Sequence, residues 1–100
     1  MDDQTLEIVT FKSVAGATPE AVIAAGQGII PWLKNQPGFI SRHMGQDKEG
    51  HWVDCVRWQS HGHALAAADA MMEAPGASAF MHVIEPSSIV MRHYHLAFAA

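Results

Sequence analysis

The sequence predicts an α+β protein with the ferredoxin-like order β-α-β-β-α-β, in which one four-stranded antiparallel sheet carries both helices on the same face. Segments rich in β-branched and aromatic residues alternate in this order with segments of helical spacing, and glycine and proline turns separate them. Right-handed crossovers then define the sheet. The 100 residues suffice for one two-layer core, so we expect a single domain over residues 1–100.

The first predicted strand covers residues 5–14, because TLEIVTFKSV favours extended backbone and ends at an Ala-Gly turn. Thr18, Pro19 and Glu20 follow as a helix N-cap, a proline at the first helical position and an acid in the first turn. The first helix is therefore expected to begin here.

Proline also interrupts and ends this helix. Pro31 lacks the N–H that would bond the carbonyl of Gln27, so we expect a kink or a short break near Ile30. The pair Pro37-Gly38 ends the element.

A hairpin is predicted next. Residues 39–44 and 51–58 both favour extended backbone, and the polar segment GQDKEG between them forms the turn. Alternation along the second of these strands predicts two faces. Trp52, Asp54, Val56 and Trp58 lie on one face, and His51, Val53, Cys55 and Arg57 lie on the other.

Ser60 is the predicted N-cap of the second helix, which Pro75-Gly76 ends. Its expected apolar stripe consists of Ala64, Leu65, Ala68, Met71 and Met72. Residues 77–84 form another short helical turn, and residues 87–98, after Pro86, form the fourth strand.

Charge excludes several classes of partner. Ten carboxylates outnumber six basic side chains, for a net charge of -4, and no basic cluster follows a phosphate backbone, so we expect no nucleic acid ligand. The apolar runs are too short for a membrane span and the start of the chain is acidic, so a cytoplasmic protein is expected. The single cysteine, Cys55, cannot form an internal disulfide and is expected to be a small buried hydrophobe.

The uncovered face of the sheet predicts association. Only 16% of the residues are charged, which is few for a chain whose whole surface meets water. We expect Val9, Phe11 and Val53 to lie on that face. Burial of such apolar area against a second copy would favour a homodimer.

Two motifs resemble a known family. The segments W-L-x-x-Q-P-G-F, from Trp32 to Phe39, and V-x-W-x-S-x-x-x-A, from Val56 to Ala64, resemble the antibiotic biosynthesis monooxygenase group of the dimeric α/β-barrel superfamily. The resemblance implies a homodimer whose two sheets form a β-barrel, with a ligand pocket between sheet and helices in each subunit. It also implies, as one possibility among several reactions, a cofactor-independent monooxygenase acting on a small apolar or aromatic compound.

A haem-degrading branch of the superfamily offers a minor alternative. It resembles this chain at Trp58, after the third strand, and at a histidine beyond the second helix, for which His82 is the candidate. It also uses an asparagine on the first strand, where this chain has Thr10. Haem is therefore a possible cofactor, and none is predicted; the simpler role for His82 is to interact with the last carbonyls of a helix.

The seven histidines raise the question of a metal. His61 and His63 point in different directions at the start of a helix. His93 and His95 share one face of a strand, and Glu7, Asp54 or His43 could supply a third ligand. The simpler role is that of pocket or interface imidazoles, and no metal is predicted.

Histidine is the predicted proton-transfer residue of an enzyme, because imidazole titrates near neutrality. The candidate bases are His43 and His93, beside Trp58 as an apolar wall with an N–H donor. Further ligand-binding candidates are Thr10, His82 and His95. Trp32, Trp52, Met71, Met72 and Met81 either line a cavity or belong to the core, which is the commoner role. The alternative of a different class is a homodimer that binds a small ligand without catalysis.

Overall fold

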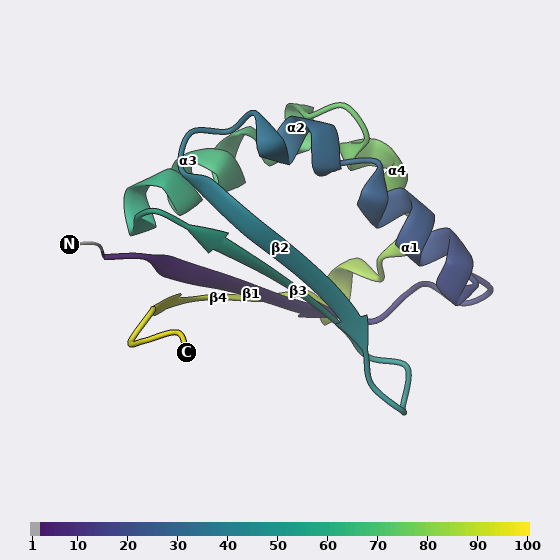
Figure 1. Ribbon diagram of the computed structural model, residues 1–100. Helices are drawn as coiled ribbons and strands as arrows, with labels where there is room; N and C mark the ends of the chain where they lie inside the picture. Colours follow the sequence, from purple (N-terminus) through teal and green to yellow (C-terminus); the bar gives the residue numbers. More distant parts are fainter. Residues whose placement is uncertain (1–2) are drawn as a thin grey trace.

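A computed structural model describes residues 3–100 and confirms the predicted α+β fold (Figure 1). The elements are β1 (Thr5–Phe11), α1 (Pro19–Gln27), α2 (Ile30–Lys34), β2 (Phe39–Gln46), β3 (Trp52–Trp58), α3 (His61–Ala70), α4 (Ala77–Val83) and β4 (Val90–His95). Short 3-10 turns cover Met71–Glu73 and Pro86–Ser88. No helix within residues 3–100 has both the length and the apolar character needed to cross a membrane.

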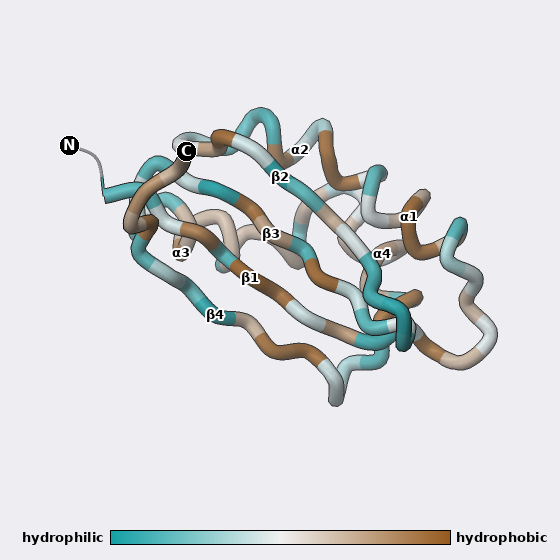
Figure 2. Tube along the Cα trace, turned by 60° about the horizontal axis from the view of Figure 1, so that its bottom comes forward, coloured by the Kyte–Doolittle hydropathy of each residue, from teal (hydrophilic) through white to brown (hydrophobic). Residues whose placement is uncertain are grey.

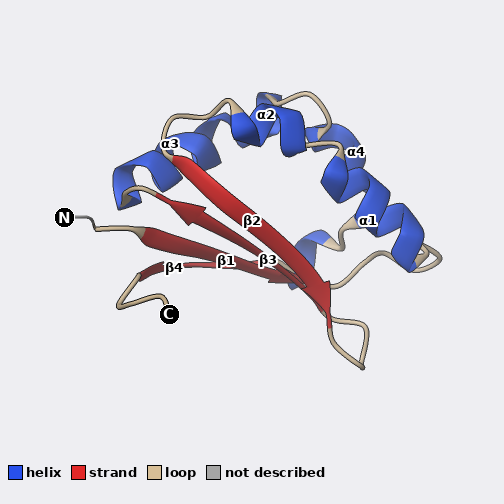
Figure 3. Ribbon diagram, in the orientation of Figure 1, coloured by secondary structure: helices blue, strands red, loops and turns tan. Residues whose placement is uncertain are grey.

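The four strands form one antiparallel sheet in the order β2-β3-β1-β4. The helices all lie on one side of this sheet, and the other side is bare (Figure 3). Strands β2 and β4 are the edges. The described chain therefore has an inner face beneath the helices and an open face.

The first helical region begins and breaks for local reasons. The Thr18 hydroxyl accepts the N–H of Ala21 at 3.1 Å, as expected of an N-cap. The predicted break is present, and α1 ends at Gln27, the residue whose carbonyl Pro31 cannot bond. Pro31 itself lies in the first turn of α2, where a missing N–H has no cost.

A β-bulge near the start of β2 reverses which side chains face inward. The pairing passes from Phe39 opposite Trp58 directly to Ser41 opposite Arg57, so Ile40 is an extra residue. Simple alternation from the inward Phe39 would turn His43 inward as well. The bulge shifts this phase by one residue, and Arg42 faces inward while His43 faces outward.

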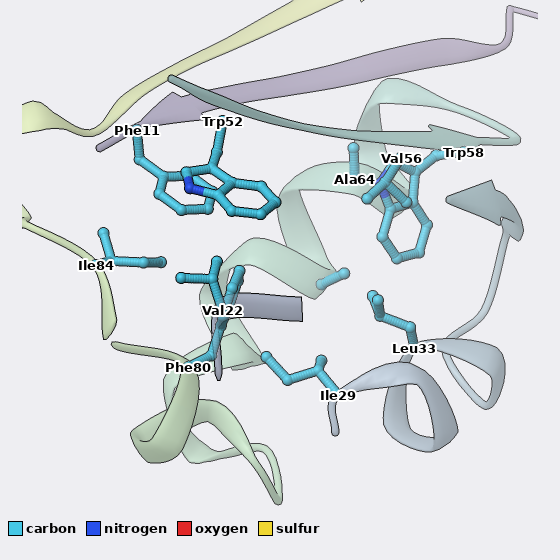
Figure 4. Close-up of a cluster of buried hydrophobic side chains, with 11 residues drawn as sticks. Phe11, Val22, Ile29, Leu33, Trp52, Val56, Trp58, Ala64, Phe80 and Ile84 are labelled. Carbon is cyan, nitrogen blue, oxygen red and sulfur yellow. The ribbon is translucent and has the colours of Figure 1, made fainter. Parts of the chain in front are cut away.

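The core lies between the inner face and the helices, and Figure 4 shows its main side chains. Trp58, Ile29 and Val22 are its largest fully buried residues. The predicted stripe of α3 is partly wrong. Ala64 and Ala67 are buried, whereas Leu65 and Met72 are 44% and 64% exposed. Alanine is small enough to let α3 lie close to the sheet.

Two of the three residues expected on the open face lie on the inner face instead. Phe11 is 2% exposed within the core, and Val9 packs against the core; Val53, at 37% exposed, does lie on the open face. Strand β1 is apolar on both faces, so composition alone could not set its phase. The apolar residues on the open side, which Figure 2 turns forward, are Leu6, Ile8, Val53, Cys55, Val90 and Tyr94.

Candidate active site

A chamber of about 230 Å³ lies between the inner face of the sheet and the helices. A cavity in this position is what the family resemblance implies. Its walls are apolar, and its charged lining residues are Glu7, Arg42 and Asp54, all on strands. The apolar lining comes from both layers and consists of Val9, Phe11, Trp32, Leu33, Val56, Ala67, Ala68, Met71, Met72, Phe80, Met81, Ile84, Ile89 and Met91.

Arg42 and Asp54 form a buried ion pair at one side of the chamber. The guanidinium donates from Nε and Nη2 to the two carboxylate oxygens at 2.9 and 2.8 Å, and its Nη1 donates to the Gly26 carbonyl at 2.6 Å. The side chains are 8% and 10% exposed. The guanidinium donates to Asp54 on the sheet and to Gly26 on α1. Because these bonds occupy it, the ion pair connects α1 to the sheet and is not suited to a chemical reaction.

Glu7 and His93 form the second charged pair. They lie opposite each other on β1 and β4, and Oε2 of Glu7 is 2.8 Å from Nε2 of His93. The two side chains are 10% and 17% exposed. Glu7 lines the chamber, whereas His93 lies beside it, toward the edge of the sheet. A carboxylate hydrogen-bonded to an imidazole is an arrangement that can accept and pass on a proton.

The two predicted bases, His43 and His93, lie on opposite faces of the sheet. His93 is on the inner face, bonded to Glu7, and His43 is exposed on the open face opposite Cys55. His95 shares the inner face with His93 but is exposed, with Nε2 4.0 Å from a carboxylate oxygen of Asp3. The chamber therefore reaches His93 only through Glu7, and it does not reach His43.

The remaining predicted ligand-binding residues do not line the chamber. Trp58 is 1% exposed and packs edge to face on Phe39, with ring centroids 5.9 Å apart. Its indole N–H has no hydrogen-bond partner among residues 3–100. Thr10 is exposed on the open face, and His82 is exposed in the last turn of α4. The structure thus does not bring these three residues together with His93.

The aromatic and methionine residues divide between two cavities. Trp32, Met71, Met72 and Met81 line the chamber. Trp52 lines a larger cavity of about 650 Å³ between α1, α2 and the edge strand β2. Arg42 and Leu33 border both cavities and separate them.

The only group of three potential metal ligands within residues 3–100 lies outside the chamber, in the hairpin turn. Asp47, Glu49 and His51 bring three potential ligand atoms within 4.8 Å of one another, and all three are exposed. The Asp47 carboxylate accepts the backbone N–H groups of His51 and Glu49 at 2.9 Å each. The bond from His51 is the main reason why the pKa of Asp47 is lowered. These hydrogen bonds stabilise the hairpin turn, and they explain why the three side chains lie close together.

Glu7 and Arg42 are the site residues that sequence reasoning did not identify as such. The sequence offers Glu7 only as a possible metal ligand, and because β1 is apolar on both faces, alternation does not show which way Glu7 points. Arg42 carries no signal of burial either, because the bulge at Ile40 decides its direction. A carboxylate that points into the apolar core needs a hydrogen-bond partner, and the partner of Glu7 is His93.

Solved structures share this fold. A mutant of SnoaB, a cofactor-independent oxygenase from Streptomyces nogalater, has a TM-score of 0.78 at 14% identity over 97% of this chain and 96% of that one. Proteins provisionally described as antibiotic biosynthesis monooxygenases have TM-scores of 0.78 (Bordetella bronchiseptica; 12% identity, 96% and 99% covered) and 0.74 (Nitrosomonas europaea; 15%, 98% and 94%). No family model and no curated protein matches the sequence. The predicted resemblance is thus confirmed at the level of fold.

Proposed function

We propose that the protein is a cofactor-independent monooxygenase that oxidises a small phenol in the chamber beneath the helices. The observation that carries this proposal is the hydrogen-bonded pair of Glu7 and His93, of which Glu7 lines a mainly apolar cavity. An apolar pocket with a few convergent polar groups is the usual form of a small-molecule site. The oxygenase SnoaB, described as cofactor-independent, shares the fold and supports the same assignment.

The size of the chamber limits the substrate. A protein cavity of about 150 Å³ accommodates benzene. The chamber measures about 230 Å³, which fits a compound of one or two fused rings. Its lining includes Met71, Met72 and Met81, whose side chains adapt to flat apolar ligands of irregular outline. We therefore expect one- and two-ring phenols to be oxidised and larger ring systems to be rejected.

The proposed reaction balances with dioxygen as the only oxidant. A phenol loses the hydrogen of its hydroxyl group and the hydrogen at the para carbon, and gains one oxygen atom at that carbon to become a quinone. The second oxygen atom leaves with the two hydrogens as water. Glu7, supported by His93, takes the phenol proton first, because the phenolate is much richer in electrons than the phenol and reacts more readily with dioxygen.

Oxygen uptake with 1-naphthol tests the proposal. Wild-type protein should consume one dioxygen for each 1,4-naphthoquinone formed. Glu7→Gln and His93→Ala should lower kcat by about 10²-fold or more, the usual contribution of a general base. His43→Ala, on the open face, and His82→Ala, on α4, serve as matched histidine controls and should retain the wild-type rate.

Two results would contradict the assignment. Equal loss in His43→Ala and His93→Ala would mean that the chamber is not the reaction site. Saturable binding of one- and two-ring phenols with no turnover of any of them would favour the non-catalytic ligand-binding protein instead.

We further propose that a second copy of the chain covers the open face. The molecule exposes 6185 Å². A compact monomer of 10.9 kDa exposes about 5,600 Å². The excess of about 600 Å² approaches the roughly 800 Å² that each partner contributes to a standard interface. Val53, Val90 and Tyr94, which are 37–47% exposed on this face, are the kind of residue that such an interface buries.

Solution mass tests this homodimer. Val53→Lys places a charge on the open face and should convert a dimer to a monomer. Leu65→Lys, at a similarly exposed apolar position on α3, should leave the mass unchanged. A wild-type protein that stays monomeric at high micromolar concentration would overturn the proposal.

A further inference from the structure

His61 and His93 lie next to each other although they belong to different layers. Their rings meet edge to face, with centroids 5.3 Å apart and planes at 88°. His61 is the first residue of α3 and is exposed, whereas His93 lies on β4 with its side chain 17% exposed. The contact therefore joins a solvent-facing imidazole to one that is mostly enclosed.

Glu7, His93 and His61 form a continuous series from the chamber to the surface. Glu7 lines the chamber and is 8% exposed as a residue. Its Oε2 is 2.8 Å from Nε2 of His93. No hydrogen bond joins Nδ1 of His93 to another residue in the described part of the chain, which leaves this nitrogen free to exchange a proton toward His61.

We propose that His61 is the positioning and proton-exchange residue that connects the Glu7–His93 pair to solvent. The proposal rests on the function proposed above. In the chamber Glu7 must be a carboxylate when the phenol enters, yet the apolar walls leave little water to remove a proton from it. A proton that reaches Glu7 passes to His93, and His93 releases one to His61, which meets bulk water. The same series returns a proton when the reaction needs one, so no net charge accumulates.

Few other ionisable groups face this series within residues 3–100. Glu7 from β1 and His61 from α3 face His93 directly. His95 follows on the same face of β4 and lies 4.0 Å from Asp3. His63, also on α3, is engaged by Ser60, whose Oγ lies 2.7 Å from its Nδ1. His61 is therefore the side chain placed to complete the connection.

Buffer-dependent kinetics test the proposal. In His61→Ala, kcat for 1-naphthol should fall about tenfold at low buffer concentration and recover as imidazole buffer is added, because the buffer replaces the missing ring. Wild-type protein and His82→Ala should show no such dependence. A wild-type rate in His61→Ala at low buffer concentration would overturn the relay while leaving the oxygenase intact, provided that His93→Ala remains impaired.

Proton exchange measured by NMR tests the relay without turnover. If His61 receives the proton that His93 releases, the imidazole N–H of His93 should exchange with water more slowly in His61→Gln than in wild type. His82→Gln is the matched control and should leave the exchange rate unchanged. An unchanged exchange rate in His61→Gln would show that His61 does not connect His93 to solvent and would overturn the proposal. Absence of oxygen uptake by the wild type would instead contradict the proposed function.

Discussion

The guanidinium of Arg42 and the carboxylate of Asp54 meet in two hydrogen bonds of 2.8 and 2.9 Å beneath the helices. They lie on neighbouring strands, β2 and β3, and both are nearly buried. The same guanidinium holds the Gly26 carbonyl of α1. One side chain thus connects two strands and a helix at the boundary between the two cavities.

Arg42→Ala should lower the free energy of unfolding by about 3–5 kcal/mol, because it leaves the Asp54 carboxylate buried without a partner. Urea denaturation measures this loss. The double variant Arg42→Met, Asp54→Leu should recover most of it, since no charge then remains buried. Lys48→Ala, in the exposed hairpin turn, should change stability by less than about 0.5 kcal/mol. A double variant no better than Arg42→Ala would contradict this account.

Gly76→Ala should destabilise the protein more than Gly16→Ala. Both glycines have positive φ, +90° and +88°, so each alanine has a backbone cost of about 1–2 kcal/mol. At Gly76 the added Cβ would also lie 2.8 Å from the Gly28 carbonyl oxygen, whereas at Gly16 it meets nothing within 4 Å. Thermal unfolding of the two variants measures the difference. Equal losses would mean that α4 does not approach the end of α1 this closely.

Ala68→Phe should block the chamber. Ala68 lines the cavity from α3, and a phenyl group there would occupy the space proposed for the substrate ring. Ala66→Phe, on the exposed side of the same helix, is the matched control. Calorimetric titration with 1-naphthol should detect binding to the control and none to Ala68→Phe. Undiminished binding to Ala68→Phe would place the ligand elsewhere, for instance in the larger cavity beside β2.

Ionisation of the Cys55 thiol should lower the free energy of unfolding at alkaline pH. Burial, and next the negative charge of Asp54, raise the pKa of the thiol above its ordinary value. The folded state therefore holds this proton more tightly than the unfolded state does. Stability is unaffected by this group below the unfolded pKa and falls as pH rises from there through the folded pKa.

Urea denaturation between about pH 7.5 and 9.5 measures this effect. The free energy of unfolding should decline with pH more steeply in wild type than in Cys55→Ala, which has no thiol. Parallel declines would show that the thiol ionises equally easily in both states. Alkylation by iodoacetamide should also be slower in the folded protein than in urea at the same pH.

The sequence predicts most of the fold because its signals are local. Thr18 and Pro19 start α1, Ser60 starts α3, and Pro31 cannot bond the residue at which α1 ends. Each of these acts within one or two turns of helix, where residue type determines backbone geometry. The predicted first strand was three residues too long, since regular pairing ends at Phe11 and only Ser13 adds an isolated bridge to Ile84.

The site was harder to predict because it depends on phase and on distant pairing. The phase of β1 could not be read from its apolar residues, which occupy both faces, and Phe11 and Val9 were misplaced for that reason. Glu7 and His93 are 86 residues apart, and only the pairing of the first and last strands brings them together. The sequence offers Glu7 only as one of three possible third ligands of a metal at His93 and His95, and it does not predict the hydrogen bond between Glu7 and His93.

The extra residue at Ile40 has a consequence for comparing this protein with its relatives. In a homologue that lacks the insertion, the cavity-facing residues of the edge strand would have the opposite phase when counted from the start of the strand. A single gap placed at Ile40 would bring the two sequences into register. Placing that gap a few positions away would equate a solvent-facing histidine in one protein with a cavity-facing residue in the other. Inheritance of a reaction between such relatives is therefore best judged from superposed strands rather than from aligned letters.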